Sequence, residues 1–100
     1  MFVRVMTDYG AQPLWVRRES DDIHVDTSPS NLGLSASLAG RLEAWRLWGE
    51  SAINFDDPHD SREVSDEEAA AFQAEGRLLT RRVAAELPQA VVNYGADGAP

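Results

Sequence analysis

The sequence lacks cysteine and lysine, and both absences limit what the protein can be. Without cysteine the fold has no disulfide bond and no thiolate ligand for zinc. All nine basic residues are arginine, against 17 aspartate and glutamate residues, so the formal net charge is -8. Such a surface repels nucleic acid and anionic membranes and attracts a basic protein. Solubility alone is the alternative explanation of the charge.

Long hydrophobic runs are also missing. No stretch approaches the ~18 apolar residues of a membrane span. The N-terminal residues 1–8 have no basic segment followed by an apolar run, so they do not resemble a signal peptide. We therefore expect a cytoplasmic protein without membrane contact, while export by a signal-free route stays open. A chain of 100 residues predicts a single α+β domain over residues 1–94 and a flexible C-terminal tail over residues 95–100.

Short runs of β-favouring side chains predict strands towards both ends of the chain. Residues 2–7 and 14–17 are two such runs, and residues 8–13 between them are typical of a hairpin loop. Residues 23–27 alternate apolar and polar side chains, which predicts a third strand at a sheet edge. Residues 90–94 predict a final strand, which we expect to pair beside the first.

A first helix is predicted over residues 35–54. Leu38, Leu42 and Trp45 recur at spacings of four and three, so they share one helical face. Ser35 can act as the N-cap, although no Glu or Gln stands at the place that would complete a capping box. We therefore expect the helix to begin at Ser35.

A second helix begins with a full capping box, in which Ser65 and Glu68 satisfy each other's backbone amides. It ends at Leu87, before a proline. Gly76 lies within its apolar stripe, where glycine costs about 1 kcal/mol relative to alanine. A close crossing explains such a glycine, and Gly49 of the first helix is a candidate for the opposing surface.

The predicted order β-β-(β)-α-α-β indicates an α+β fold. A small two-layer sandwich, with an antiparallel or mixed sheet and two helices on one face, buries all the apolar stripes.

The most unusual segment runs from Asp56 to Glu68 and holds seven acids but one arginine. An EF-hand loop beginning at Asp56 fails, because Pro58 and Ser61 occupy positions that need a ligand and a glycine. We therefore expect no metal site and no cofactor. The acids can stabilise the second helix through its dipole, or they can present carboxylates to a basic partner.

Trp48 lies at the edge of the first helix's stripe, so it is either core or a half-exposed interface anchor. Leu47 and Leu78 lie off their stripes and are candidates for a dimer contact. The partner-binding residues that we predict are Asp56, Asp57, Asp60, Glu63, Glu67 and Trp48.

Catalysis has little support in the sequence. His24 and His59 are the only histidines, and neither has a nucleophile at a recognisable spacing. No phosphate-binding glycine loop and no metalloprotease motif is present. We therefore predict no catalytic residue.

Several short motifs together resemble a known family. The motifs are Asp8-Tyr9-Gly10, Pro13-Leu14-Trp15, Leu34-Ser35 with Leu38, Leu42 and Trp45, Asn54 with Asp57-Pro58, and Phe72 with Glu75-Gly76-Arg77. They resemble an uncharacterised family of small acidic bacterial proteins, common in GC-rich genomes, over roughly residues 2–94. Ala36 and Ser37 depart from its pattern, which has acids there. The resemblance implies no catalytic residues, and proteins of this type are associated with immunity or partner binding.

The leading hypothesis is a non-enzymatic acidic protein-binding module, of the immunity type, that inhibits a basic protein partner. The first alternative is a structural or regulatory homodimer that uses Leu47, Leu78 or an exposed strand edge. The second alternative is a small enzyme that uses paired carboxylates.

Overall fold

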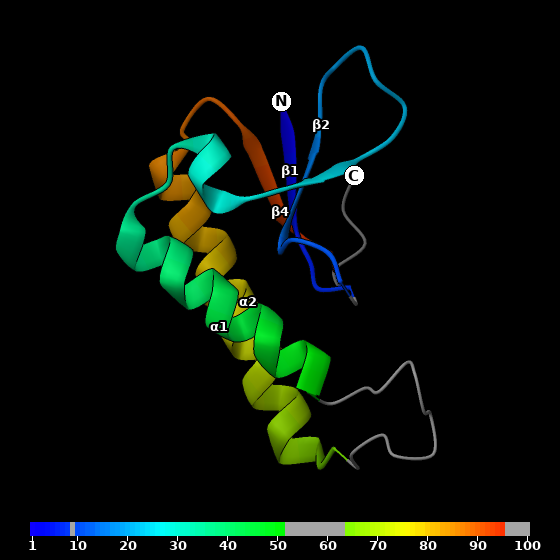
Figure 1. Ribbon diagram of the computed structural model, residues 1–100, viewed down its shortest axis with the longest axis vertical. Coiled ribbons are helices and arrows are strands. Elements are labelled where there is room, and N and C mark those ends of the chain that lie inside the picture. Colours follow the sequence, from blue (N-terminus) through cyan, green and yellow to red (C-terminus); the bar gives the residue numbers. More distant parts are fainter. Residues whose placement is uncertain (9, 52–63, 96–100) are drawn as a thin grey trace.

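The computed structural model describes residues 1–8, 10–51 and 64–95. The predicted tail, apart from Gly95, lies outside this part of the chain. Within it the elements are β1 (Phe2–Val5), β2 (Leu14–Arg17), β3 (Val25–Thr27), the short 3₁₀ helix η1 (Pro29–Leu32), α1 (Ala36–Ser51), α2 (Asp66–Glu86) and β4 (Val91–Tyr94). Figure 1 shows the two long helices side by side on one face of the sheet. The predicted two-layer α+β fold is confirmed.

The sheet is mixed, with strand order β3-β2-β1-β4. β1 pairs with β2 in antiparallel fashion and with β4 in parallel fashion, so the last strand does return beside the first. Three strands are shorter than predicted, and one of them is β4, which begins at Val91 rather than at residue 90. β1 ends at Val5, although the amide of Met6 still donates to the carbonyl of Pro13 at 3.0 Å. β3 begins at Val25, because Ile23 lies in the connecting loop with 69% of its surface exposed.

The core lies between the sheet and the helix pair. Alternation along the strands turns Val3, Val5 and Leu14 towards the helices, and all three are fully buried. They meet the α1 and α2 stripes, in which Trp45 and Leu79 are the central buried residues. The helical faces predicted from the sequence are therefore confirmed. No helix in the described ranges has the length and apolar character needed to cross a membrane.

The N-cap of α1 is Ser35, as predicted, and its acidic partner comes from the far end of α2. The Ser35 hydroxyl oxygen accepts a hydrogen bond from the amide of Leu38 at 3.3 Å. The Glu86 carboxylate accepts two more, from the Ser35 amide and the Ser35 hydroxyl, each at 2.7 Å. These bonds hold the pKa of Glu86 below its usual range. Glu86 thus accepts the hydrogen bond of the N-cap amide, which in a capping box an acid of the same helix accepts.

The Glu86 contact predicts a stability change with pH. Because the pKa of Glu86 is lowered in the folded state, its contribution is present above the unfolded pKa of about 4.3 and is lost as the pH falls through the lowered value. E86Q should therefore lower the urea midpoint at pH 7, and the difference from wild type should shrink on acidification. Chemical denaturation at pH 7 and pH 3 measures this. E19Q, in an exposed loop, is the control, and equal effects of the two variants would contradict the role of Glu86.

Gly76 marks the closest approach between α2 and its neighbours. A Cβ atom at this position would lie 2.5 Å from Cε1 of Tyr94 and 2.8 Å from Cζ2 of Trp45. The predicted close crossing is therefore confirmed, but the proposed partner was wrong: Gly49 faces Phe72 and Thr7 instead. A helix with a side chain here could not sit against both aromatic rings.

Alanine substitutions at two helical glycines should have opposite effects. G76A forces a methyl group into the rings, and overpacking of this kind typically costs about 1–3 kcal/mol of unfolding free energy. G40A is the matched control, because Gly40 is exposed in α1 and its Cβ would meet nothing within 4 Å. It should raise the stability by roughly 0.5–1 kcal/mol. Urea unfolding of both variants tests this, and a stabilising G76A would contradict the crossing.

Candidate functional site

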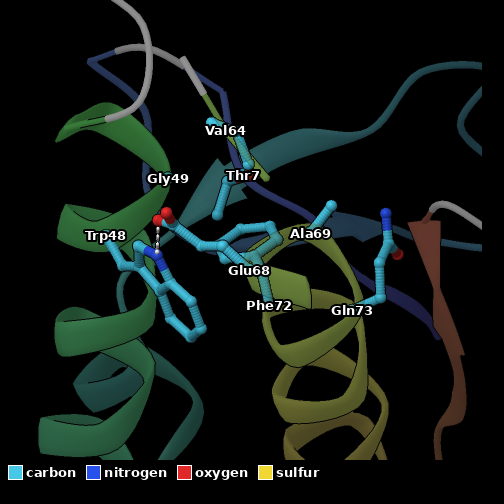
Figure 2. Close-up of a pocket in the computed structure, with 8 residues that line it drawn as sticks. All are labelled: Thr7, Trp48, Gly49, Val64, Glu68, Ala69, Phe72 and Gln73. Carbon is cyan, nitrogen blue, oxygen red and sulfur yellow. Dashed lines mark hydrogen bonds between the residues drawn. The ribbon is translucent and has the colours of Figure 1, made fainter. Parts of the chain in front are cut away.

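A pocket opens where the C-terminal end of α1 meets the N-terminal end of α2. Its volume is about 200 Å³, and its surface is mostly apolar. The lining residues, drawn in Figure 2, are Thr7, Trp48, Gly49, Val64, Glu68, Ala69, Phe72 and Gln73. A cavity of about 150 Å³ holds a benzene-sized molecule, so this pocket has room for one large side chain.

Trp48 forms one wall of the pocket and is half-buried. Its indole N–H donates to Oε2 of Glu68 at 2.9 Å, which is the dashed contact in Figure 2. Its ring meets the Phe72 ring edge-on, with centroids 5.1 Å apart and an interplanar angle of 90°. The indole is thus fixed by one polar and one aromatic contact, and it presents a preset surface rather than a freely rotating side chain.

Phe72 connects the pocket with the core. Its ring stacks on Trp45 at 4.9 Å, with the two planes 16° apart. The indole N–H of the buried Trp45 also donates to the Phe72 backbone carbonyl at 3.0 Å. The pocket residue Phe72 therefore cannot move without disturbing the centre of the core.

Acidic residues border the pocket on the α2 side. The Ser65 hydroxyl oxygen accepts from the amide of Glu68 at 3.1 Å, which confirms Ser65 as the N-cap. Asp66, Glu67 and Glu68 form the first turn, where negative charge suits the helix dipole. Asp66 and Glu67 are exposed, whereas Glu68 is half-buried against Trp48. Of these three acids, Asp66 and Glu67 are therefore the ones whose carboxylates are exposed to solvent beside the pocket.

Two carboxylates near the end of α1 share one arginine. Arg46 forms ion pairs with Glu43 and Glu50, one turn before and one turn after it. The hydrogen bond from Arg46 holds the pKa of Glu43 below its usual range. Glu50 also accepts from the amide of Gly10 at 2.9 Å, which ties the β1–β2 loop to α1. These contacts therefore link neighbouring turns of α1 and the β1–β2 loop, and Arg46 balances one of the two negative charges.

The structure places two of the six predicted partner-binding residues. Trp48 lines the pocket, and Glu67 lies exposed in the first turn of α2, next to the glutamate that Trp48 contacts. The other four, Asp56, Asp57, Asp60 and Glu63, lie outside the described residues. Of the leucines named for a dimer contact, Leu47 is 51% exposed and Leu78 is half-buried.

Sequence reasoning missed Phe72 and Glu68 as pocket residues. Phe72 follows the helical period of α2 and so resembles an ordinary core residue, while Glu68 is fully explained by the capping box. Only their juxtaposition with Trp48 of α1 reveals the pocket, and no pattern within α2 carries that information. Among the described residues, no group of three or more metal-ligating side chains lies close enough to hold an ion.

The fold and the pocket define a class: a small α+β protein with an apolar recess beside exposed carboxylates. The chain belongs to the Serratia CdiI immunity protein-like family, whose family model matches residues 1–97. The match spans both layers of the sandwich and the pocket, and it supports the role of an immunity-type inhibitor. No curated protein matches the chain in sequence.

Substitutions at Trp48 should separate its two contacts. W48F keeps much of the ring but removes the N–H that Glu68 accepts, so it should lower the unfolding free energy by about 1 kcal/mol. W48A also removes the packing on Phe72 and should cost roughly 3 kcal/mol. Urea unfolding provides the two values. If W48A costs no more than W48F, the ring does not pack as described.

Proposed function

We propose that this immunity-family protein binds a basic toxin at the α1–α2 end of the helix pair and blocks it by occupying its surface. The family match over residues 1–97 carries the inhibitor role. The choice of surface is supported by the pocket between Trp48 and Phe72 and by the exposed acids that begin α2.

The negative net charge of the protein supports the proposal that its partner is basic. The net charge of -8 favours encounter with a positive surface, and long-range attraction of this kind raises association rates. The segment that joins α1 and α2 in the sequence contains Asp56, Asp57, Asp60 and Glu63, and Glu67 lies in the first turn of α2. These carboxylates would meet arginine or lysine side chains of the toxin.

The pocket supports a central apolar anchor. Binding energy at protein interfaces concentrates in a few residues, often tryptophan, that lie in pockets from which water is excluded. Trp48 is fixed by Glu68 and Phe72 before any partner arrives, so little side-chain entropy is lost on binding. We infer that a toxin side chain enters the recess beside Trp48 while the acids surround the contact. Inhibition by occupation of a surface needs no catalytic residue.

A capture experiment tests the charge. Tagged protein is incubated with lysate of the source cells, washed in low and then high salt, and the retained proteins are identified by mass spectrometry. We expect a basic protein that high salt releases. The triple variant D56N/D57N/D60N should retain much less of it, because several steering charges are lost together. The matched control E19Q/D21N/D22N neutralises three exposed acids in the β2–β3 loop and should retain it fully. Equal losses in both variants would contradict the proposed surface.

Association and dissociation rates with the captured partner distinguish electrostatic steering by the acids from apolar anchoring by Trp48. E67Q should slow association a few-fold at low salt with little effect on dissociation, since exposed charges act mainly on the encounter. W48A should speed dissociation by ten-fold or more, because removing a central anchor typically costs at least 2 kcal/mol. W48F is the control that retains a ring. Surface plasmon resonance measures both rates, and unchanged dissociation of W48A would exclude Trp48 from the interface.

A further inference from the structure

The face of the sheet that points away from the helices carries an unexpected group of side chains. Because strand residues alternate, Phe2, Arg4, Trp15 and Arg17 all lie on the side opposite the buried Val3, Val5 and Leu14. The strand register places Arg17 directly beside Phe2, and Arg4 beside Trp15. His24 lies one residue beyond the last β2–β3 pair, opposite Arg17. This open face thus brings together two arginines, a histidine and two aromatic rings.

Arg17 is held in place without being neutralised. Its guanidinium lies over the Phe2 ring, 4.3 Å from the centroid. It also donates to the backbone carbonyl of Asp21 at 3.1 Å. Among the described residues it forms no ion pair, in contrast to Arg41 and Arg46. A positioned cation with donors to spare is well suited to a carboxylate, which guanidinium binds through two parallel hydrogen bonds.

Two ring nitrogens beside Arg17 also lack partners. Trp15 Nε1 and His24 Nε2 are buried, and no described residue supplies them with a hydrogen-bond partner. Buried polar atoms are normally satisfied, so each such exception calls for an explanation. Both nitrogens are shielded from solvent, so a bound segment can reach them only if the atoms that cover them shift.

Charged groups of both signs lie around His24. Desolvation, together with the positive charges of Arg4 and Arg17, holds the pKa of His24 below its usual range. Asp26 shares this face opposite Trp15, but its Oδ2 accepts from the amide of Gln12 at 3.0 Å. The exposed acids of the adjoining loop are Glu19, Asp21 and Asp22. Acids therefore adjoin this face, but Arg17 remains a positive centre that no carboxylate of the described residues pairs with, on a protein that is negative overall.

We propose that the open face of the sheet binds an acidic segment of a partner protein, with Arg17 as the anchor for a carboxylate and Phe2, Trp15 and His24 around it. This surface lies on the opposite side of the sheet from the helices and requires neither the pocket nor the 56–68 acids. It gives the protein a second contact whose charge preference is the reverse of the first. Its test is therefore independent of whether the toxin binds at the α1–α2 end.

The probe is a hexaglutamate peptide added to the intact protein at low ionic strength, followed by NMR of the Trp15 indole N–H and the His24 ring. We expect saturable shifts of both signals and a rise in the pKa of His24 when the carboxylates bind. R17Q should weaken the binding about tenfold or more, as expected for a lost charge-assisted contact. R17K should retain part of it, because the charge remains and the planar donor pair is lost. R82Q, at an exposed position of α2, should bind as wild type does.

Several results would overturn this proposal. One is the absence of saturable shifts in the wild-type protein. Another is an R17Q variant that binds the peptide as tightly as wild type does, with an unchanged Trp45 indole signal as the check that its core is intact. Hexalysine that shifts the same two signals would show that the face does not select negative charge. Free glutamate with the same saturable effect would reduce the surface to a small-anion site. Shifts that grow with protein concentration alone would mean that a second copy of the chain occupies the face.

Discussion

The packing of Trp45, Phe72 and Tyr94 around Gly76 is the constraint on which the rest of the structure depends. Trp45 stacks on Phe72, lies 6.2 Å from Tyr94 between centroids, and donates its indole N–H to the Phe72 carbonyl. One aromatic group thereby joins α1, α2 and β4. Since β4 pairs with β1 in the centre of the sheet, this group also fixes the layer of strands against the helices. The absence of a side chain at Gly76 makes the arrangement sterically possible.

The pocket is a consequence of this packing. Phe72 stacks on Trp45 in the core and contacts Trp48 edge-on at the surface. The packing of the core therefore determines the position of the pocket wall. Glu68 then fixes the indole of Trp48 through a single hydrogen bond. A recess whose walls are held by the core keeps its shape without a ligand, and preorganisation of this kind lowers the entropic cost of binding.

The α1–α2 end and the open sheet face differ in charge. The α1–α2 end combines an apolar recess with exposed acids, and the open sheet face holds Arg17 over Phe2 without a carboxylate partner among the described residues. Opposite charge preferences at separate surfaces discriminate between partners more strongly than one surface does, because a wrong partner meets repulsion at one of them.

Local patterns in the sequence determined the elements and their faces. The periodicity of Leu38, Leu42 and Trp45, the Ser65 cap and the strand alternation identify helices, strands and core, because each depends only on neighbours within a few residues. The acidic composition likewise favoured a binding protein. The tertiary structure alone decided that Glu86 supplies the acid missing at Ser35, that Gly76 faces Tyr94 rather than Gly49, and that Trp48, Glu68 and Phe72 enclose a pocket. These contacts join residues far apart in the chain, and their geometry follows from how the layers pack, which no local pattern encodes.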